Sequence, residues 1–226
     1  MAIKVVISGY GRMGHMVEQV LAKKGIELAL ASEDITAVDP ELARRCVCID
    51  FTTPDAFRAN YPALARLFKA VVVGTTGWYD IRDQVFACFR QCGTPMIWAS
   101  NYSIGVNVLT TAVETVSRLL GKAGGYAPYI VEKHHCHKLD APSGTAKTLA
   151  AAVERNLGNP PSIASVRVGE VPGIHTVGFE GPSERITLEH EAFSRRGFAE
   201  GAVTAALMTD GLTGVHEFKE LLLKEI

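Results

Sequence analysis

The chain has 226 residues, of which 47% are hydrophobic and 21% are charged, and its formal net charge is -1 at pH 7. This length allows one large domain or two small ones, and the composition is that of a globular protein. Because the net charge offers no general attraction to nucleic acid or to an acidic membrane, any anion must be bound by a local cluster. No apolar run approaches the roughly 20 residues that span a bilayer, and the N-terminal residues lack a signal-peptide pattern. We therefore expect a cytoplasmic protein with no nucleic-acid or membrane partner.

The first hundred residues alternate between expected strands and helices. Residues 3–8 form a continuous apolar run, typical of a parallel strand buried on both faces. The helix that follows is expected to end at Gly25, and Thr53-Pro54-Asp55 begins another. Further strands are expected at residues 27–31, 47–51, 70–73 and 96–99. This alternation predicts a doubly wound parallel sheet. Ligands bind beyond the C-terminal ends of such strands, where this chain has polar tips at Gly9, Glu33, residues 74–76 and residues 100–103.

The pattern changes beyond about residue 105. A linking helix is expected at residues 106–120, a strand at 129–133, a helix at 146–157, and strands near 165–168 and 175–179. Residues 184–192 alternate, with Ile186 and Leu188 on the opposite side from the polar residues. This predicts a mostly antiparallel sheet with one solvated or partner-facing side. Helices at 198–208 and 217–223 are expected to pack back on the first domain.

The expected fold class is therefore α/β with two domains. A Rossmann-like doubly wound parallel sheet would comprise residues 1–104 and 197–226, and bind a dinucleotide. Residues 105–196 would form an α+β domain for substrate binding and oligomerisation.

A glycine-rich turn joins the first expected strand to its helix. Gly9-Tyr10-Gly11-Arg12-Met13-Gly14 fits G-x-G-x-x-G in the strand-to-helix context that gives this motif its meaning. The free N–H groups of the helix N-terminus suit a pyrophosphate. Glu33 lies about 20 residues past the glycines, where a carboxylate accepts hydrogen bonds from a ribose 2′-hydroxyl. Asp34 beside it would repel a 2′-phosphate, so NADH is slightly favoured over NADPH, although Arg12 leaves NADPH open.

The most reactive stretch is His134-His135-Cys136-His137-Lys138, which is followed by Leu139-Asp140-Ala141-Pro142-Ser143-Gly144-Thr145-Ala146. If the strand continues through it, His134, Cys136 and Lys138 share one side, and His135 and His137 the other. Ser143 is a good helix N-cap and Gly144 lets a ligand approach the backbone, so residues 143–145 form an expected anion cradle. Titratable groups beside such a cradle predict proton transfer to an acidic small molecule.

Some residues of this stretch have simpler interpretations. Cys136 is expected to be a spacer, His137 to be structural, and Asp140 to brace the loop by hydrogen bonds. A metal site built from His134, His135, His137 and Cys136 is an alternative, but adjacent residues of a strand point to opposite faces, so we expect no metal. The five cysteines show no paired zinc spacing and are expected to be mostly buried apolar residues.

These motifs together resemble the 4-hydroxy-tetrahydrodipicolinate reductase family, formerly called dihydrodipicolinate reductase. Residues 132–146 are similar to the family signature E-x-H-H-x-x-K-x-D-A-P-S-G-T-A, and Gly11-Arg12-Met13-Gly14, Gly74-Thr75-Thr76-Gly77, Ala99-Ser100-Asn101-Tyr102-Ser103 and Phe198-Ala199-Glu200-Gly201-Ala202 are similar to further family blocks. The resemblance implies NADH- or NADPH-dependent reduction of a cyclic imine dicarboxylate to tetrahydrodipicolinate in lysine and diaminopimelate biosynthesis, by a homotetramer. A non-catalytic dinucleotide sensor of the same fold is the alternative.

The resemblance also implies roles for individual residues. His134 is implied as the proton donor or acceptor and Lys138 as a second proton donor, while His135, Gly144 and Thr145 are implied to bind substrate beside Ser143. The implied cofactor-binding residues are Ser8, Gly9, Tyr10, Gly11, Arg12, Met13, Glu33, Gly74, Thr75, Thr76, Ala99, Ser100, Asn101 and Tyr102.

Overall fold

The computed structural model describes residues 3–225, which divide into two compact units. Within the described range, the first unit comprises residues 3–103 and 196–225, and the second comprises residues 104–195. None of the helices in the described range is long and apolar enough to cross a membrane.

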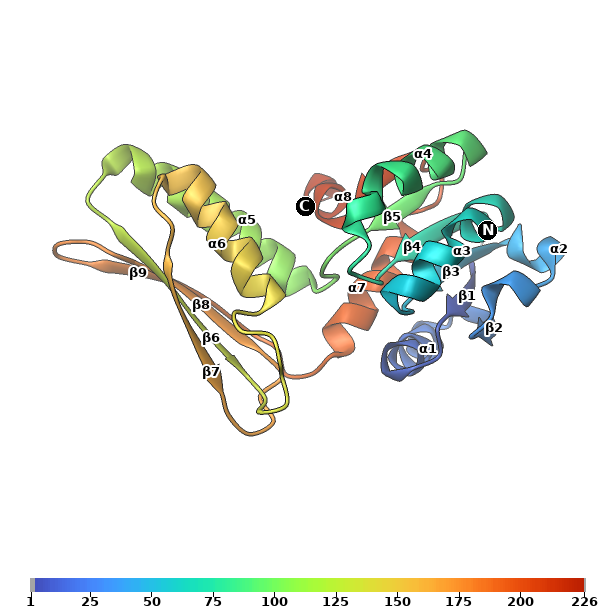
Figure 1. Ribbon diagram of the computed structural model, residues 1–226, viewed down its shortest axis with the longest axis horizontal. Coiled ribbons are helices and arrows are strands. Elements are labelled where there is room, and N and C mark those ends of the chain that lie inside the picture. Colours follow the sequence, from blue (N-terminus) through green and yellow to red (C-terminus); the bar gives the residue numbers. More distant parts are fainter. Residues whose placement is uncertain (1–2, 226) are drawn as a thin grey trace. The chain divides into compact units, whose positions relative to one another are not determined.

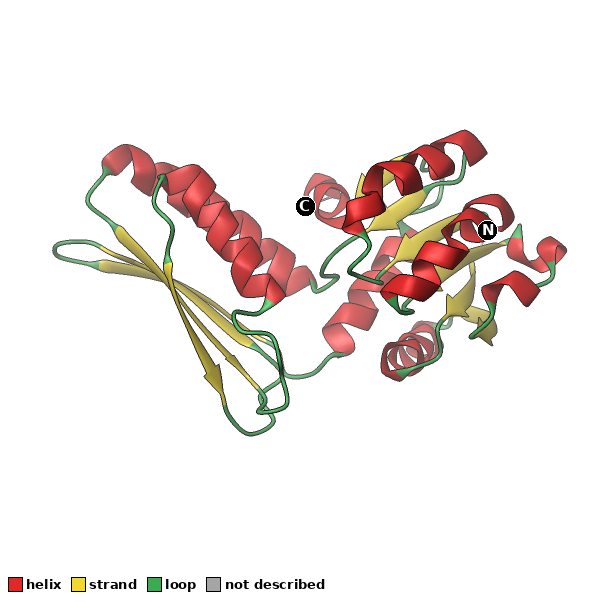
Figure 2. Cartoon of the chain, in the orientation of Figure 1, coloured by secondary structure: helices red, strands yellow, loops and turns green. Residues whose placement is uncertain are grey.

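The first unit contains a parallel six-stranded sheet with the order β10-β5-β4-β3-β1-β2 (Figures 1 and 2). Its strands are β1 (Lys4–Ser8), β2 (Glu27–Ser32), β3 (Cys46–Asp50), β4 (Ala70–Val73), β5 (Met96–Trp98) and β10 (Val215–Glu217). Its helices are α1 (Arg12–Lys24), α2 (Pro40–Ala43), α3 (Pro54–Leu67), α4 (Arg82–Cys92), α7 (Arg196–Leu207) and α8 (Phe218–Glu225), with single 3₁₀ turns η1 (Ile35–Ala37) and η2 (Tyr79–Ile81). The predicted doubly wound parallel sheet is confirmed.

Two buried layers enclose this sheet. Alternate residues of β1 and β3 pack with α1 and α7 on one face, and the remaining ones pack with α3 and α4 on the other. The strands are therefore buried on both sides, which explains their continuous apolar sequences. Cys46 and Cys48 belong to this core, whereas Cys92 and Cys136 are exposed, so the expectation that most cysteines are buried was wrong.

One strand of the first unit was not predicted. β10 pairs in parallel with β5 and occupies residues 215–217, the last of which the sequence pattern places in the final helix. Three residues are too few to show a period of two, so only tertiary pairing identifies this strand.

The second unit is a four-stranded sheet with two helices, in the order β7-β6-β8-β9. Its elements are α5 (Ile104–Ala123), β6 (Ala127–His134), α6 (Gly144–Leu157), β7 (Ser162–Arg167), β8 (Ile174–Glu180) and β9 (Arg185–Glu191). β6 pairs in parallel with β7 and antiparallel with β8, and β8 pairs antiparallel with β9. The predicted mostly antiparallel sheet is confirmed, with one parallel edge.

The helices α5 and α6 cover one face of this second sheet (Figure 1). Ile130, Val177 and Phe179 are buried against them, and Ile186 and Leu188 of β9 lie partly buried on the same side. The intervening residues of β9 are exposed, as the alternation predicted. This arrangement places the ends of β6 and β7 next to the first turn of α6.

Candidate active site

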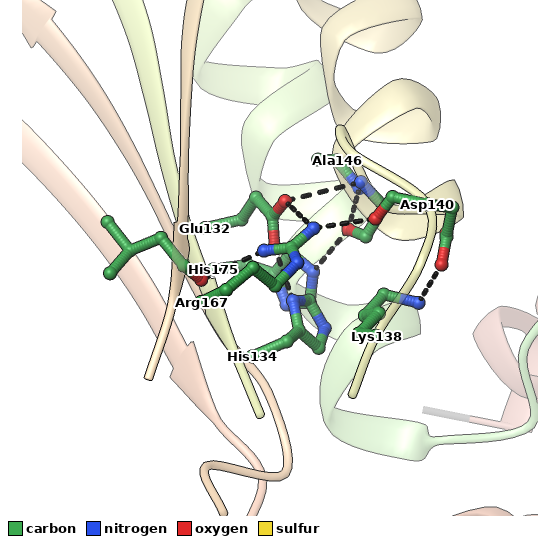
Figure 3. Close-up of polar contacts among 9 residues, drawn as sticks. Glu132, His134, Lys138, Asp140, Ala146, Arg167 and His175 are labelled. Atoms are coloured by element: carbon green, nitrogen blue, oxygen red, sulfur yellow. Dashed lines mark hydrogen bonds and ion pairs between the residues drawn. The ribbon is translucent and has the colours of Figure 1, made fainter. Parts of the chain in front are cut away.

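A buried carboxylate at the end of β6 pairs with an arginine and a histidine. Glu132 is fully buried, and its Oε1 and Oε2 accept hydrogen bonds from the two terminal nitrogens of Arg167 at 2.7 and 3.1 Å (Figure 3). Oε2 of Glu132 also pairs with Nδ1 of His134. Burial raises the pKa of Glu132, but the hydrogen bonds from Arg167, Ser165 and His134 outweigh it and hold the pKa at about 2. Glu132 is therefore a carboxylate at every physiological pH.

Strand geometry explains why these groups meet. Glu132 and His134 are two residues apart in β6, so both face the helices. The parallel register pairs His134 with Arg167 of β7. With Nδ1 on the carboxylate, Nε2 is the ring nitrogen of His134 that remains for a ligand. Gly173 keeps the space beside this Nε2 open, because any other residue at position 173 would place a Cβ 3.1 Å from it.

The second histidine of this site, His175, comes from β8 and was not predicted. Its ring lies edge-on to His134, with 5.1 Å between centroids, and its Nε2 is 3.1 Å from Oγ of Ser143. Burial and the neighbouring His134 lower the pKa of His175 to about 4, so it is neutral near pH 7.

The predicted N-cap of α6 is confirmed. Oγ of Ser143 accepts a hydrogen bond from the backbone N–H of Ala146 at 3.2 Å. The Ser143 hydroxyl is thus engaged by its own helix and by His175, and it is 2% exposed. Gly144 is exposed, and no atom lies within 4 Å of the position of a Cβ there. An anion at this helix end would therefore meet Gly144 and Thr145 rather than the Ser143 side chain.

Lys138 lies on the loop that follows β6. Its Nζ is 2.7 Å from Oδ1 of Asp140, and a terminal nitrogen of Arg167 donates to the carbonyl of Asp140 at 2.6 Å (Figure 3). The ammonium of Lys138 lowers the pKa of Asp140. Asp140 thus braces the loop, as its sequence context predicted.

The strand does not continue through the cluster, so the predicted alternation of residues 134–138 was wrong. β6 ends at His134, and the backbone turns as the N–H of Lys138 donates to the carbonyl of His135 at 3.1 Å. His135 is half-buried, and its Nδ1 has no hydrogen-bond partner in the described chain. A buried, unpartnered ring nitrogen fits a ligand contact.

The alternative metal site does not form in the described chain, because the ligand atoms of its four residues do not lie together: His134, His135, Cys136 and His137. Among the described residues, His134 groups with Glu132 and His175, whereas Cys136 and His137 group with Glu170. Arg167 already occupies both oxygens of Glu132, and its positive charge opposes a metal ion at the buried group.

The glycine-rich turn of the first unit fits a dinucleotide. Gly9 has a φ of +87°, and a Cβ there would lie 2.4 Å from the carbonyl oxygen of Phe51. A Cβ on Gly14 would lie 2.4 Å from the carbonyl oxygen of Gly9. Gly11, in contrast, faces open space and leaves α1 without a side-chain cap. The free N–H groups at this helix start are the donors that a pyrophosphate needs.

Several residues implied to bind cofactor have side chains that also contact the framework. The side chain of Thr75 is 4% exposed and bonds Asp50 and the N–H of Thr52. Tyr102 is 2% exposed, and its hydroxyl lies within hydrogen-bond distance of the carbonyl oxygens of Val73 and Ile97. Tyr10 bonds Glu18. Glu33 is exposed directly after β2, while Asp34 caps η1 by accepting from Thr36.

A buried carboxylate also organises the strand ends of the first unit. Asp50, at the end of β3, accepts hydrogen bonds from Ser8 at 2.7 Å and Thr75 at 2.6 Å. Burial raises the pKa of Asp50, and the bonds from these hydroxyls oppose that effect. Asp50 thereby joins the C-terminal ends of β1, β3 and β4, where ligands bind in such sheets.

We expect Asp50→Asn to weaken cofactor binding, because an amide cannot accept from both hydroxyls through two carboxylate oxygens. The lost charged hydrogen bonds should lower the free energy of unfolding by about 1.5–3 kcal/mol and raise the dissociation constant for the dinucleotide. Chemical denaturation and fluorescence titration would measure both quantities. Asp55→Asn, at an exposed position of α3, is the matched control; equal effects in the two variants would contradict the role of Asp50.

The fold and the two sites define a class. A parallel dinucleotide-type sheet, joined in one chain to a mixed sheet with a histidine–carboxylate pair, is the organisation of a nicotinamide-dependent oxidoreductase with a separate substrate unit. The family model described as "Dihydrodipicolinate reductase, N-terminus" matches residues 3–102, and the one described as "Dihydrodipicolinate reductase, C-terminus" matches residues 105–222. The chain belongs to the dihydrodipicolinate reductase family.

Individual relatives support the same family. The chain is 34% identical to the 4-hydroxy-tetrahydrodipicolinate reductase of Christiangramia forsetii, over 97% of this chain and 98% of that one. It is also 34% identical to the enzyme of the same name from Ralstonia nicotianae, over 97% and 99%. A solved structure of dipicolinate-bound dihydrodipicolinate reductase from Paenisporosarcina sp. TG-14 has a TM-score of 0.79 at 20% identity, covering 96% of this chain and 98% of that chain. That structural likeness supports the fold.

Proposed function

We propose that the protein catalyses the NAD(P)H-dependent reduction of 4-hydroxy-tetrahydrodipicolinate to tetrahydrodipicolinate, in lysine and diaminopimelate biosynthesis. The observation that carries the proposal is the buried Glu132–His134 pair beside Lys138 and the N-terminus of α6, in a chain that matches the family throughout. The substrate is a small dicarboxylate, and the first unit provides the dinucleotide site.

The residues of the second unit suit a dianionic substrate. Gly144 and Thr145 start α6, where the helix dipole favours a carboxylate. His135 offers its unpartnered Nδ1. Lys138 adds an ammonium that Asp140 holds in place. This local positive potential attracts the anion although the whole chain is nearly neutral.

Proton delivery is the chemical task of His134 and Lys138. A bound reduced nicotinamide supplies the hydride. Hydride addition to a conjugated imine builds negative charge, which an adjacent acid neutralises by giving a proton. Glu132 stabilises the cationic form of His134 through Nδ1, leaving Nε2 to hold the transferable proton. The salt bridge to Asp140 holds the Lys138 side chain in place.

The pH dependence should differ between free and substrate-bound protein. Burial lowers the pKa of His134, the hydrogen bond that its ring donates to Glu132 opposes this, and Lys138 and Arg167 lower the pKa further. Substrate carboxylates counter those cations and should raise the pKa of His134 in the complex. If protonated His134 is the acid, kcat/KM falls as pH rises through the pKa of His134 in the free protein. kcat falls at the higher pKa of His134 in the complex. Measured profiles with coincident inflections would contradict this.

Steady-state assays test the function directly. We expect oxidation of NADH and NADPH only when the dihydrodipicolinate-synthase product is present, with a higher kcat/KM for NADH. That preference follows from Glu33 after β2 and from Asp34, whose charge opposes a 2′-phosphate. Tight NADH binding without turnover would favour a non-catalytic sensor instead.

We also infer a cytoplasmic homotetramer that associates through the second sheet. Its face opposite α5 and α6 exposes Ala164 and Val166 of β7 and the polar residues of β9. A sheet face of this mixed character suits an interface between identical copies. Light scattering on a size-exclusion column should give four times the chain mass, and Val166→Lys should dissociate the assembly; a monomeric wild-type protein would overturn the inference.

A further inference from the structure

A second group of potential metal ligands lies outside the buried site. Cys136 and His137 belong to the turn after β6, and Glu170 belongs to the connection from β7 to β8. The sulfur, an imidazole nitrogen and a carboxylate oxygen all lie within 4.8 Å of one another. Nε2 of His137 and Oε1 of Glu170 are 3.6 Å apart. All three side chains are exposed.

Backbone hydrogen bonds hold the two segments together. The N–H of Val168 donates to the carbonyl of His134 at 2.9 Å, and the N–H of Cys136 donates to the carbonyl of Gly169 at 3.0 Å. These bonds extend the parallel pairing of β6 and β7 past the ends of both strands. The ligands are therefore brought together by the fold, and a metal would have to order only their side chains.

The end of β6 at His134 removes the geometric objection to a shared metal. Neighbouring residues of a strand point to opposite faces, but Cys136 and His137 lie in a turn and their ligand atoms converge on Glu170. The buried Glu132–His134–His175 group does not compete, because Arg167 neutralises its carboxylate.

We propose that Cys136, His137 and Glu170 bind one Zn²⁺ ion at the surface of the second unit. Thiolate, imidazole and carboxylate are the three ligand types that zinc combines, and solvent can complete the tetrahedron. A thiolate disfavours Mg²⁺ and Ca²⁺, which prefer oxygen ligands alone. None of the three residues has a role in the proposed reaction, so the zinc site can be tested independently of that function.

Cobalt substitution tests the site without any activity measurement. The full-length protein, reduced and freed of metal, should bind one equivalent of Co²⁺ with a thiolate-to-cobalt charge-transfer band, and Zn²⁺ should displace it. Cys136→Ser should abolish the band. Glu170→Gln should weaken Zn²⁺ binding by at least about tenfold, the loss that even an outer partner of a metal ligand causes.

The chain offers a matched control for the thiol. Cys88 and Cys92 lie one turn apart on α4, and the thiol of Cys92 is exposed. Cys92→Ser should leave the cobalt band and the Zn²⁺ affinity unchanged. A band that disappears in Cys92→Ser and persists in Cys136→Ser would overturn the proposal, as would a wild-type spectrum without a thiolate band. Circular dichroism of each variant would show that the fold is retained.

Discussion

His134→Gln is expected to lower kcat by about 10²–10⁴-fold, the usual contribution of a positioned acid or base. Glutamine keeps a polar side chain of similar length but cannot carry the proton, and the ion pair of Glu132 with Arg167 is retained. The KM for the dinucleotide should change little, because the glycine-rich turn belongs to the first unit. Single-turnover and steady-state kinetics on the purified variant would separate these quantities.

The control for this substitution lies three residues away. His137→Gln removes an equivalent ring from an exposed position that does not contact Glu132, and kcat should stay near the wild-type value. Lys138→Ala should also lower kcat, and the double variant should lose less than the product of the two single losses, because both groups serve one proton transfer. A normal kcat in both His134→Gln and Lys138→Ala would remove these residues from the mechanism.

The sequence predicted the parallel sheet well because its strands are uniformly apolar and separated by clear helix starts. Thr53, for example, caps α3 as its position before Pro54 indicated. It also located the loop of the second unit that carries Lys138 and the N-cap Ser143. These features depend on residues close together in the chain, where period and capping rules apply.

The partners of His134 could not be found in the same way. Arg167 is 35 positions from Glu132 along the chain, and His175 is brought in by the antiparallel pairing of β8 with β6. Only strand register places them together. One local signal existed: Glu132 precedes His134 by two residues in a strand, so an acid had to share the buried face of the histidine.

Burial also changes what a motif residue can do. Ser143, Thr75 and Tyr102 occur in family-like blocks, but their side-chain hydroxyls are used by the framework. A hydroxyl that caps a helix or joins two strands has fewer lone pairs and protons left for a ligand. The sequence alone does not distinguish these supporting positions from the residues that would touch a ligand.

The Glu132–Arg167 pair should carry the largest effect on stability. Arg167→Met leaves the buried carboxylate of Glu132 with His134 but without its arginine, which should lower the free energy of unfolding by about 3 kcal/mol. This is the low end for breaking a buried pair, because Arg167 is partly exposed. The pKa of Glu132 is near 4.5 in the unfolded chain, so its low pKa in the folded protein adds stability that is fully present above pH 4.5. This contribution is lost as the pH falls toward about 2. Without the guanidinium, burial raises that pKa, so the loss should begin at higher pH.

A double substitution separates the effect of the Glu132 charge on stability from its effect on catalysis by His134. Glu132→Gln in the Arg167→Met background removes the uncompensated buried charge, so urea denaturation should show that much of the lost stability returns. Activity should not return, because His134 still lacks the carboxylate that stabilises its protonated ring. If stability and kcat recover together, Glu132 acts only as a structural partner of Arg167. If Arg167→Met alone unfolds at the wild-type urea concentration, the pair does not stabilise the second unit.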